Sequence, residues 1–567
     1  MLGHVKIALS KFRITPSTAR LFAPRLATRT KTTHQANMSS VNQATAQSKV
    51  INYENMNPHI KRVEYAVRGE LAIRADSLKQ VRFIIIGPSC FTIDVRILID
   101  SLHPFSIPLN TPPPAAYQEL TQGDTLPFKT IINSNIGNPQ QLNQKPITFF
   151  RQVASLVDNP DLLSPENREL LLKLYPSDAI ERAELLLHNI GSIGAYSHSQ
   201  GIPHIRQNVA RFIERRDGYP ADPSKIFLTQ GASAGVQNIL QVLTEGPSTG
   251  IMIPIPQYPL YSATIALFNA TPVPYSLDES QDWGLDPKKL ASSIGQARAK
   301  GVDVRALCII NPGNPTGQCL SEANMHEIVD FCHRERVVLL ADEVYQTNVY
   351  QPAQRPFHSF KKVLRSMGPT YADFELVSFH SVSKGMVGEC GRRGGYFECT
   401  GLDPRVLEQI YKIASVSLCP NVHGQIMVDL MTNPPQEGQP SYPVYHAEVH
   451  GIYESLRRRA KRLADCFNTM EGVTCNDAQG AMYLFPRVRL PRKVIEEAKR
   501  QGRQPDEVYC LAMLDATGVC VVPGSGFGQE EGTWHFRSTF LPPEGLFDGF
   551  CAALEEFHRE FMNKYRD

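Results

Sequence analysis

Short apolar segments alternate with segments of helical periodicity over most of the chain. Several of the apolar segments are uninterrupted runs of Val, Ile and Leu, which is typical of strands buried on both faces of a parallel sheet. Between two of them, the apolar face marked by Ile328, Val329 and Phe331 predicts a helix over Ser321–Arg336. The alternation therefore predicts an α/β fold with a doubly wound, mostly parallel sheet, whose ligands bind beyond the carboxyl ends of the strands. The predicted strands are Ile226–Thr229, Gly250–Ile255, Arg305–Ile310, Val337–Ala341, Glu375–Phe379 and Gly394–Phe397.

Composition excludes several classes of protein. Of the 567 residues, 42% are hydrophobic and 20% are charged, which is unlike a disordered, collagen-like or coiled-coil chain. No apolar run reaches the roughly 18 residues of a membrane span, and a formal charge of +2 gives no footprint for nucleic acid. The 12 cysteines show no C-x-x-C spacing, so we expect neither a metal site nor a disulfide framework.

Positive charge is concentrated at the N-terminus. Residues 1–53 contain eight Lys and Arg and no Asp or Glu, so the rest of the chain carries a formal charge of −6. A basic, Ser/Thr-rich segment with apolar residues between the cations is similar to a mitochondrial transit peptide, and a solvated tail is the alternative. We therefore expect a mitochondrial (matrix) protein, and a second start at Met38 would give a cytoplasmic form.

Lys384 lies shortly after a predicted strand, inside a loop rich in Ser and Gly. A lysine in this setting suits a Schiff base, in which the amine reaches a carbonyl and then moves a proton. Arg393 stands in a G-x-R-x-G frame, where a guanidinium can hold a phosphate bidentately, with Ser381 and Ser383 as further donors. The adjacent Arg392 is a second candidate, but it lies outside that frame. A solvated Lys/Arg loop is the alternative.

Two more polar stretches follow predicted strands. Asn311–Gly317 reads N-P-G-N-P-T-G, and Ala341–Tyr345 reads A-D-E-V-Y. In this order before Lys384, they resemble the motifs of pyridoxal-phosphate enzymes of the aspartate-aminotransferase fold (fold type I). The resemblance implies a large domain built on the doubly wound sheet and a smaller α/β domain made of both chain ends.

The resemblance is closest to the alanine aminotransferases, and it covers about residues 55–79 and 119–565. On this basis we expect a targeting tail over 1–50, an N-terminal arm with part of the small domain over 51–160, the large cofactor-binding domain over 161–420, and the small C-terminal domain over 421–567. The segments that carry the resemblance are Arg62–Gly69, Ala195–Gly201, Gly231–Ser233, Ile253–Tyr261, Phe357–Lys361, Val521–Gly528 and Trp534–Arg537.

The resemblance implies roles for residues around the ring of pyridoxal 5′-phosphate. Lys384 would form the Schiff base with the cofactor and later move the proton. Asp342 would pair with the pyridine nitrogen and keep it protonated. Tyr345 and Asn314 would bond the phenolate oxygen of the cofactor, and Tyr258 would stack on the ring.

It also implies a phosphate site and a substrate site. Ala232 and Ser233 would offer donors at a helix N-terminus to the phosphate, together with Ser381 and Arg393. Arg537 would hold the substrate α-carboxylate, aided by Gly137 and Asn314. Tyr196 would reach the phosphate of a partner subunit, which implies a homodimer. These site residues are Ala232, Ser233, Ser381, Arg393, Arg537, Gly137, Asn314 and Tyr196.

The implied reaction interconverts L-alanine plus 2-oxoglutarate with pyruvate plus L-glutamate. It would be a ping-pong reaction in which pyridoxamine phosphate carries the amino group between the two substrates. One alternative is another donor and acceptor pair on this scaffold, such as glutamate and glyoxylate. Another is a lyase of the same fold type, like the aminocyclopropane-carboxylate synthases. A non-catalytic binding protein is disfavoured by the complete set of Lys384, Asp342, Tyr345 and Arg537.

Val81–Gln118 interrupts the resemblance. It contains the apolar run Phe83–Ile86, six prolines and little charge, so it has no periodic face to bury, and we expect it to be disordered or loosely packed. We interpret it as a retained intron, because its removal joins Gln80 to Glu119 and restores an amphipathic helix. Valine codons begin with GT and a glutamine codon can be CAG, as intron ends require. A genuine surface insertion is the alternative.

Overall fold

A computed structural model describes residues 56–64, 66–85 and 126–566. The predicted transit peptide, Met38 and residues 86–118 of the suspected intron lie outside the described residues. Along the part of the chain that is described, no helix combines the length and the apolar character needed to cross a membrane.

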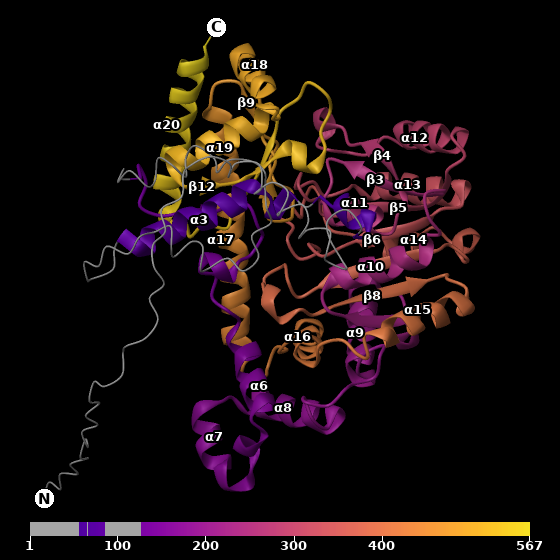
Figure 1. Ribbon diagram of the computed structural model, residues 1–567. Helices are drawn as coiled ribbons and strands as arrows, with labels where there is room; N and C mark the ends of the chain where they lie inside the picture. Colours follow the sequence, from indigo (N-terminus) through magenta and orange to yellow (C-terminus); the bar gives the residue numbers. More distant parts are fainter. Residues whose placement is uncertain (1–55, 65, 86–125, 567) are drawn as a thin grey trace, which may run out of the picture. The chain divides into compact units, whose positions relative to one another are not determined.

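A seven-stranded sheet forms the larger core (Figure 1). Strand β8 runs antiparallel to both of its neighbours, whereas every other neighbouring pair in the sheet is parallel. The predicted doubly wound, mostly parallel sheet is therefore confirmed. In their order across the sheet the strands are β2 (Ile226–Thr229), β8 (Gly395–Thr400), β7 (Leu376–Ser381), β6 (Val338–Asp342), β5 (Asp303–Ile310), β3 (Thr249–Ile255) and β4 (Thr271–Ser276).

The sequence pattern did not predict the edge strand β4. Its prolines, Pro272 and Pro274, argue against a strand in the middle of a sheet because proline lacks the N–H that a ladder needs. At the edge, β4 pairs only with β3, and Val273 and Tyr275 alternate with the prolines to face the core. The burial period of two is therefore kept although the composition is unlike that of a strand.

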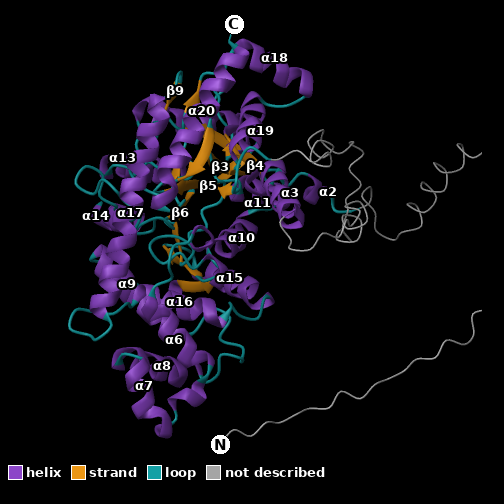
Figure 2. Cartoon of the chain, turned by 90° about the vertical axis from the view of Figure 1, so that its left-hand side faces the viewer, coloured by secondary structure: helices purple, strands orange, loops and turns teal. Residues whose placement is uncertain are grey.

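Helices cover both faces of the sheet (Figure 2). Along β3, Ile251 and Ile253 pack into one apolar cluster and Met252 into the other, because successive side chains of a strand point to opposite faces. Helix α13 (Glu322–Glu335) matches the predicted helix, and Ser321 caps it by accepting a hydrogen bond from the Asn324 N–H. One face carries α12 (Pro287–Ala299), α13 and α14 (Phe360–Ser366), and the other carries α10 (Ala232–Leu243), α11 (Leu260–Leu267) and α15 (Pro404–Val416).

A further helical layer packs against the β2 end of the sheet. Ile226 and Leu228 of β2 point into this layer, whereas Phe227 between them points to the opposite face. The layer consists of α6 (Thr148–Asp158), α8 (Ser177–Ile190), α9 (Pro203–Asp217) and α16 (Val422–Thr432), with α7 (Arg168–Leu174) beside it.

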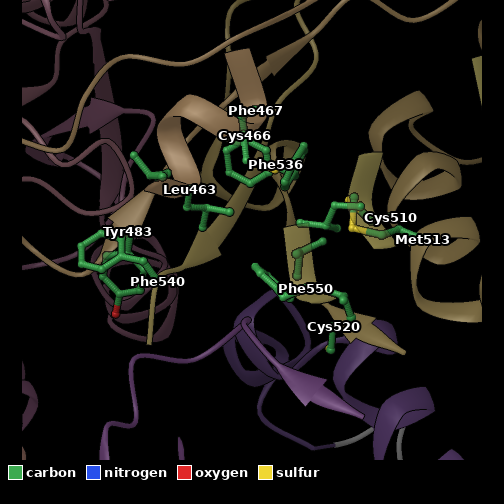
Figure 3. Close-up of a cluster of buried hydrophobic side chains, with 14 of the residues drawn as sticks. Leu463, Cys466, Phe467, Tyr483, Cys510, Met513, Cys520, Phe536, Phe540 and Phe550 are labelled. Atoms are coloured by element: carbon green, nitrogen blue, oxygen red, sulfur yellow. The ribbon is translucent and has the colours of Figure 1, made fainter. Parts of the chain in front are cut away.

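A second core joins segments from the two ends of the described chain. Leu71, Ala75 and Leu78 pack with residues of the C-terminal segments, and Figure 3 shows part of this cluster. The prediction that both chain ends build one smaller α/β unit agrees with this cluster, but the boundaries at residues 50, 160 and 420 stay predictions. The cluster involves α3 (Glu70–Ile85), α17 (Tyr442–Thr469), α18 (Arg492–Gln501), α19 (Pro505–Thr517), α20 (Phe547–Tyr565), β10 (Tyr483–Leu484), β12 (Val519–Cys520) and β14 (Phe536–Thr539).

The small strands of this part form three separate ladders. A three-stranded antiparallel sheet has the order β10-β14-β13, and it brings residue 483 opposite residue 539. The other two ladders pair β1 with β12 and β9 with β11. The strands not yet given are β1 (Ile132–Asn133), β9 (Val473–Thr474), β11 (Arg487–Val488) and β13 (Val522–Pro523).

Helix α3 continues past Gln80, where the suspected intron begins, and ends at Ile85. Residues 81–85 of the segment are therefore helical, and the expectation that Val81–Gln118 is disordered or loosely packed stays a prediction. A helix that has already nucleated gains one hydrogen bond for each residue it adds, so its extension needs no apolar periodicity. The origin of the segment as an intron stays a prediction.

Candidate active site

The topology of the sheet brings the predicted site residues to one edge. Strands β5, β6 and β7 run side by side, with Ile310 opposite Asp342 and Asp342 opposite Phe379. Because β8 runs the other way, its first residue, Gly395, lies opposite Ser381 at the end of β7. The loop before β8, which holds Arg393, therefore meets the loops that leave the parallel strands.

Asp342 is buried at the end of β6, with 4% of its surface exposed. One carboxylate oxygen, Oδ2, accepts a hydrogen bond of 3.0 Å from the Tyr261 hydroxyl. The other, Oδ1, is buried and has no hydrogen-bond partner among the described residues. Burial raises the pKa of Asp342 to about 6, although the hydrogen bond from Tyr261, the backbone N–H of Val344 and the charge of Lys384 act to lower it. A buried, half-satisfied carboxylate is suited to a cationic N–H donor.

The N-terminus of α10 and the loop before β8 form a cradle for an anion. No side chain caps α10, so the first N–H groups, at Ala232 and Ser233, are available to an acceptor. The Arg393 guanidinium donates to the Gln230 carbonyl at 3.1 Å and to the Ser383 hydroxyl at 3.4 Å.

Two further features complete this cradle. A side chain at Gly231 would clash with the Arg393 guanidinium, so the helix N-terminus and the guanidinium approach closely only because of the glycine. The Ser381 hydroxyl lies 3.0 Å from that of Ser383. The structure therefore brings together the predicted phosphate ligands.

Lys384 points from the loop after β7 toward the segment around Gly137. Its Nζ donates a hydrogen bond of 2.6 Å to the Gly137 carbonyl. A Cβ added at Gly137 would lie 2.9 Å from Nζ and would also clash with the Tyr483 hydroxyl, so only glycine fits there. The Cys390 thiol lies 3.7 Å from the same carbonyl, and burial raises its pKa.

Arg537 is buried in β14, with 1% of its surface exposed. Its Nη1 donates a hydrogen bond of 2.9 Å to the Asn314 side-chain oxygen, and its Nη2 donates to the Asn135 carbonyl. The guanidinium lies between the rings of Tyr483 and Phe527, at 4.2 and 4.7 Å from their centres. Its Nε is buried without a partner among the described residues, which leaves a donor for a carboxylate.

Tyr345 and Tyr258 belong to the same site and interact electrostatically. The Tyr345 hydroxyl donates a hydrogen bond of 3.1 Å to the Tyr483 hydroxyl. Burial raises the pKa of Tyr345 well above its ordinary value, with Tyr483 and Tyr258 acting in the same direction. Tyr258 follows β3 and is half-buried between two apolar clusters, one of which includes Phe527.

Tyr196 is the predicted site residue that the structure does not bring to this group. It lies in the loop after α8, and 79% of its surface is exposed. Within the described ranges, it makes no hydrogen bond, ion pair or ring contact with the other site residues. Its expected role toward a partner subunit stays a prediction.

Two residues of the site, Tyr261 and Tyr483, were not singled out from the sequence. Tyr261 lies in one of the segments that carry the resemblance to the family. Its position in the first turn of α11 suggested only a role in helix packing. Tyr483 lies in the apolar run Ala481–Phe485, which reads as a core strand. A buried tyrosine usually needs a hydrogen-bond partner for its hydroxyl. That a tyrosine stands in each of these apolar segments is the signal that could have pointed to a polar partner.

Residues 166–554 match the family described as aminotransferase class I and II. The chain belongs to this family. It is 52% identical over 520 residues to the probable mitochondrial alanine aminotransferase of Dictyostelium discoideum, which covers 91% of this chain and 90% of that protein. It is 49% identical over 519 residues to glutamate–glyoxylate aminotransferase 1 of Arabidopsis thaliana, over 91% of this chain and 98% of that protein.

The fold of this aminotransferase also agrees with solved structures. The alanine aminotransferase from Pyrococcus furiosus superposes with a TM-score of 0.64 over 89% of this chain and 99% of that chain, at 20% identity. The sequence-based assignment to the aminotransferases of fold type I, and hence to enzymes, is confirmed. The reading as a non-catalytic protein on a borrowed fold is excluded by it.

Proposed function

We propose that this aminotransferase moves an amino group from L-alanine to 2-oxoglutarate, giving pyruvate and L-glutamate, and catalyses the reverse reaction. The observation that carries the proposal is the position of Lys384 Nζ beside the Gly137 carbonyl, together with the Arg537–Asn314 pair. Lys384 and Arg537 both act on the Tyr483 hydroxyl, so the amine and the guanidinium belong to one site. The alanine aminotransferase named among the relatives supports the choice of substrates.

We propose that the cofactor is pyridoxal 5′-phosphate. The site fits it at three points: the partnerless Asp342 Oδ1 for the ring N–H, the uncapped N-terminus of α10 with Arg393 for the phosphate, and Lys384 for the aldehyde carbon. Tyr258 would stack on the ring, and Tyr345 and Asn314 would bond its oxygen. When bound, the cofactor supplies an electron-withdrawing ring that also carries the amino group from one substrate to the next.

The side chains of the protein then have distinct tasks. Asp342 holds the proton on the ring nitrogen, since a carboxylate in a buried site strongly favours a nearby cation. Arg537, with Asn314, orients the α-carboxylate of the substrate through paired N–H donors. Lys384 would take the proton from the substrate Cα and return it to the aldehyde carbon of the cofactor. This is general acid–base catalysis by a group within reach of both atoms.

The residue at position 137 must be a glycine for Lys384 and Tyr483 to keep their places. The Gly137 segment, Lys384 and the Tyr483 hydroxyl lie so close together that even a methyl group on Gly137 would clash. The glutamate–glyoxylate pair is the second candidate, because a relative from Arabidopsis thaliana is named for it.

We also propose a homodimer and mitochondrial import. The exposed Tyr196 is placed on the surface as a residue that serves a partner's site would be, and an isologous two-fold interface would make the contribution reciprocal. Several relatives are named as mitochondrial, and the acid-free, basic N-terminus supports import to the matrix.

The proposal that residues 81–118 are a retained intron is tested by sequencing the transcript across their codons.

A matrix of donors and acceptors tests the proposed substrates. Purified protein loaded with pyridoxal 5′-phosphate is assayed with L-alanine, L-glutamate and L-aspartate against pyruvate, 2-oxoglutarate and glyoxylate. The expected result is the highest kcat/KM for alanine with 2-oxoglutarate and for glutamate with pyruvate. A preference of tenfold or more for glyoxylate would replace the proposal with the second candidate, and elimination products without amino transfer would indicate a lyase.

A further inference from the structure

Tyr483 occupies the centre of the site although the proposed function gives it no task. It lies in β10 with 2% of its surface exposed. Its hydroxyl accepts the hydrogen bond of 3.1 Å from Tyr345, and the Arg537 guanidinium covers its ring at 4.2 Å. The hydroxyl and Lys384 Nζ both lie within bonding reach of the point where a Gly137 side chain would begin. The hydroxyl and the reacting amine therefore face the same point beside Gly137, and Lys384 acts on the phenol as a hydrogen-bond partner.

Among the described residues, the charges that act on the Tyr483 hydroxyl are both positive. They are Lys384 from the loop after β7 and Arg537 from the neighbouring strand β14, while Tyr345 from the loop after β6 contributes a neutral donor. Burial alone would raise the pKa of Tyr483, but the two cations and the hydrogen bond from Tyr345 lower it below its ordinary value.

The partner tyrosine behaves in the opposite way. Burial raises the pKa of Tyr345 far above its ordinary value, so Tyr345 keeps its proton and donates, while Tyr483 accepts. The pKa values of the two hydroxyls are therefore shifted apart beside one amine. Tyr345 keeps its proton, and Tyr483 is the member of the pair that can lose and take up a proton.

We propose that Tyr483 is a catalytic residue that exchanges a proton with Lys384, an inference that rests on the proposed function. In the forward step, which takes place when Tyr483 is ionised, a proton leaves Lys384 Nζ as an N–H bond breaks, and it forms an O–H bond with the phenolate oxygen of Tyr483. The ammonium and the phenolate become a neutral amine and a phenol, so the charge of the pair is conserved. The neutral amine has the free electron pair that Lys384 needs to accept the substrate proton, and the reverse step restores the ammonium.

The test compares Tyr483→Phe with Tyr350→Phe. Tyr350 is a matched control because it is buried near the same core and its hydroxyl bonds the Ala481 carbonyl at 2.7 Å, away from the reacting amine. Ultraviolet absorbance of tyrosinate is followed against pH in the cofactor-free protein. One tyrosine should ionise below the ordinary value of about 10 in the wild type and in Tyr350→Phe, and this signal should be missing in Tyr483→Phe.

The second readout is the rate. Tyr483→Phe should lower kcat by about a hundredfold, the lower range for loss of one general acid–base group, with the KM for alanine changed less than threefold, and Tyr350→Phe should keep kcat within twofold. A Tyr483→Phe enzyme with kcat within twofold of the wild type, or with the low-pH tyrosinate signal intact, would overturn the proposal.

A third variant covers the case in which Tyr483→Phe does not fold. In Lys384→Met the positive charge beside the phenol is removed, so the ionisation of the low-pH tyrosine should move toward its ordinary value, and an unchanged titration would overturn the proposal. These titrations use the cofactor-free protein and need no substrate. Failure of the proposed function would appear instead as a wild type without alanine transamination, so the two failures are distinguishable.

Discussion

The Tyr261 hydroxyl donates a hydrogen bond of 3.0 Å to one oxygen of Asp342, and the other oxygen has no partner among the described residues. The carboxylate is thus held in one orientation with one oxygen left for a ligand. Replacing it by alanine should lower turnover by two to four orders of magnitude, because the loss of one preorganised charge from a buried site costs about 3 to 5 kcal/mol of transition-state stabilisation.

Single-turnover kinetics of Asp342→Ala with saturating L-alanine give this number directly. Asp403→Ala is a suitable control, since this aspartate caps α15 at the surface and pairs with Arg405 away from the site. A loss of less than tenfold in Asp342→Ala would mean that another group protonates the ring.

The stability of the cofactor-free protein should depend on pH through Asp342. Its pKa is raised from 3.8 to about 6 by burial, so the folded state binds this proton more tightly than the unfolded state does. The contribution of Asp342 is therefore fully present below pH 4 and is lost as the pH rises through 6, by roughly 3 kcal/mol in total. Urea unfolding at pH 5 and pH 7 should show a larger fall for the wild type than for Asp342→Asn. Equal falls in the two proteins would refute the shifted pKa.

Lys384→Ala should abolish turnover without unfolding the protein. The phosphate, ring nitrogen and carboxylate contacts come from other residues, so the variant should still bind pyridoxal 5′-phosphate non-covalently. Equilibrium dialysis and melting temperature check the binding and the fold, and borohydride reduction should attach no cofactor. Repeated turnover at a rate comparable to the wild type would remove Lys384 from the proposed mechanism.

Arg537→Lys should affect the substrate more than the fold. A lysine keeps the charge but loses the planar pair of donors and the stacking between Tyr483 and Phe527. We expect kcat/KM for alanine to fall by about a hundredfold, as for the loss of a buried bidentate contact to a carboxylate. Arg405→Lys, a surface arginine paired with Asp403, is the matched control and should stay within twofold. An Arg537→Lys enzyme with unchanged kcat/KM would show that another group binds the carboxylate.

The strands could be predicted from the sequence where a local run of apolar residues coincides with burial on both faces of the sheet. β2 and β6 are apolar runs that end in one polar residue, and both were predicted within a residue of their bounds. β4 was missed because its prolines are acceptable only at a sheet edge, and the position of a strand in the sheet is not a local property. Helix α3 was not expected to pass Gln80 for a different reason: an already nucleated helix can extend without apolar periodicity.

The sequence predicted those site residues that directly follow a strand or belong to a recognisable motif. Asp342, Lys384 and Arg393 have polar chemistry in places where packing does not require it. Tyr261 and Tyr483 bond partners 81 and 138 positions away in the chain, so their tasks exist only once the fold has formed. Both tyrosines stand among apolar residues in the sequence, so they were read as packing residues.

The most direct test of the central claim is the half-reaction. Protein loaded with pyridoxal 5′-phosphate is mixed with L-alanine alone, and pyruvate is measured with time beside the absorbance of the cofactor. The account predicts one pyruvate per loaded subunit, with release then stopping until 2-oxoglutarate is added and one glutamate is formed. No pyruvate, or pyruvate that continues to form without a keto acid, would contradict it.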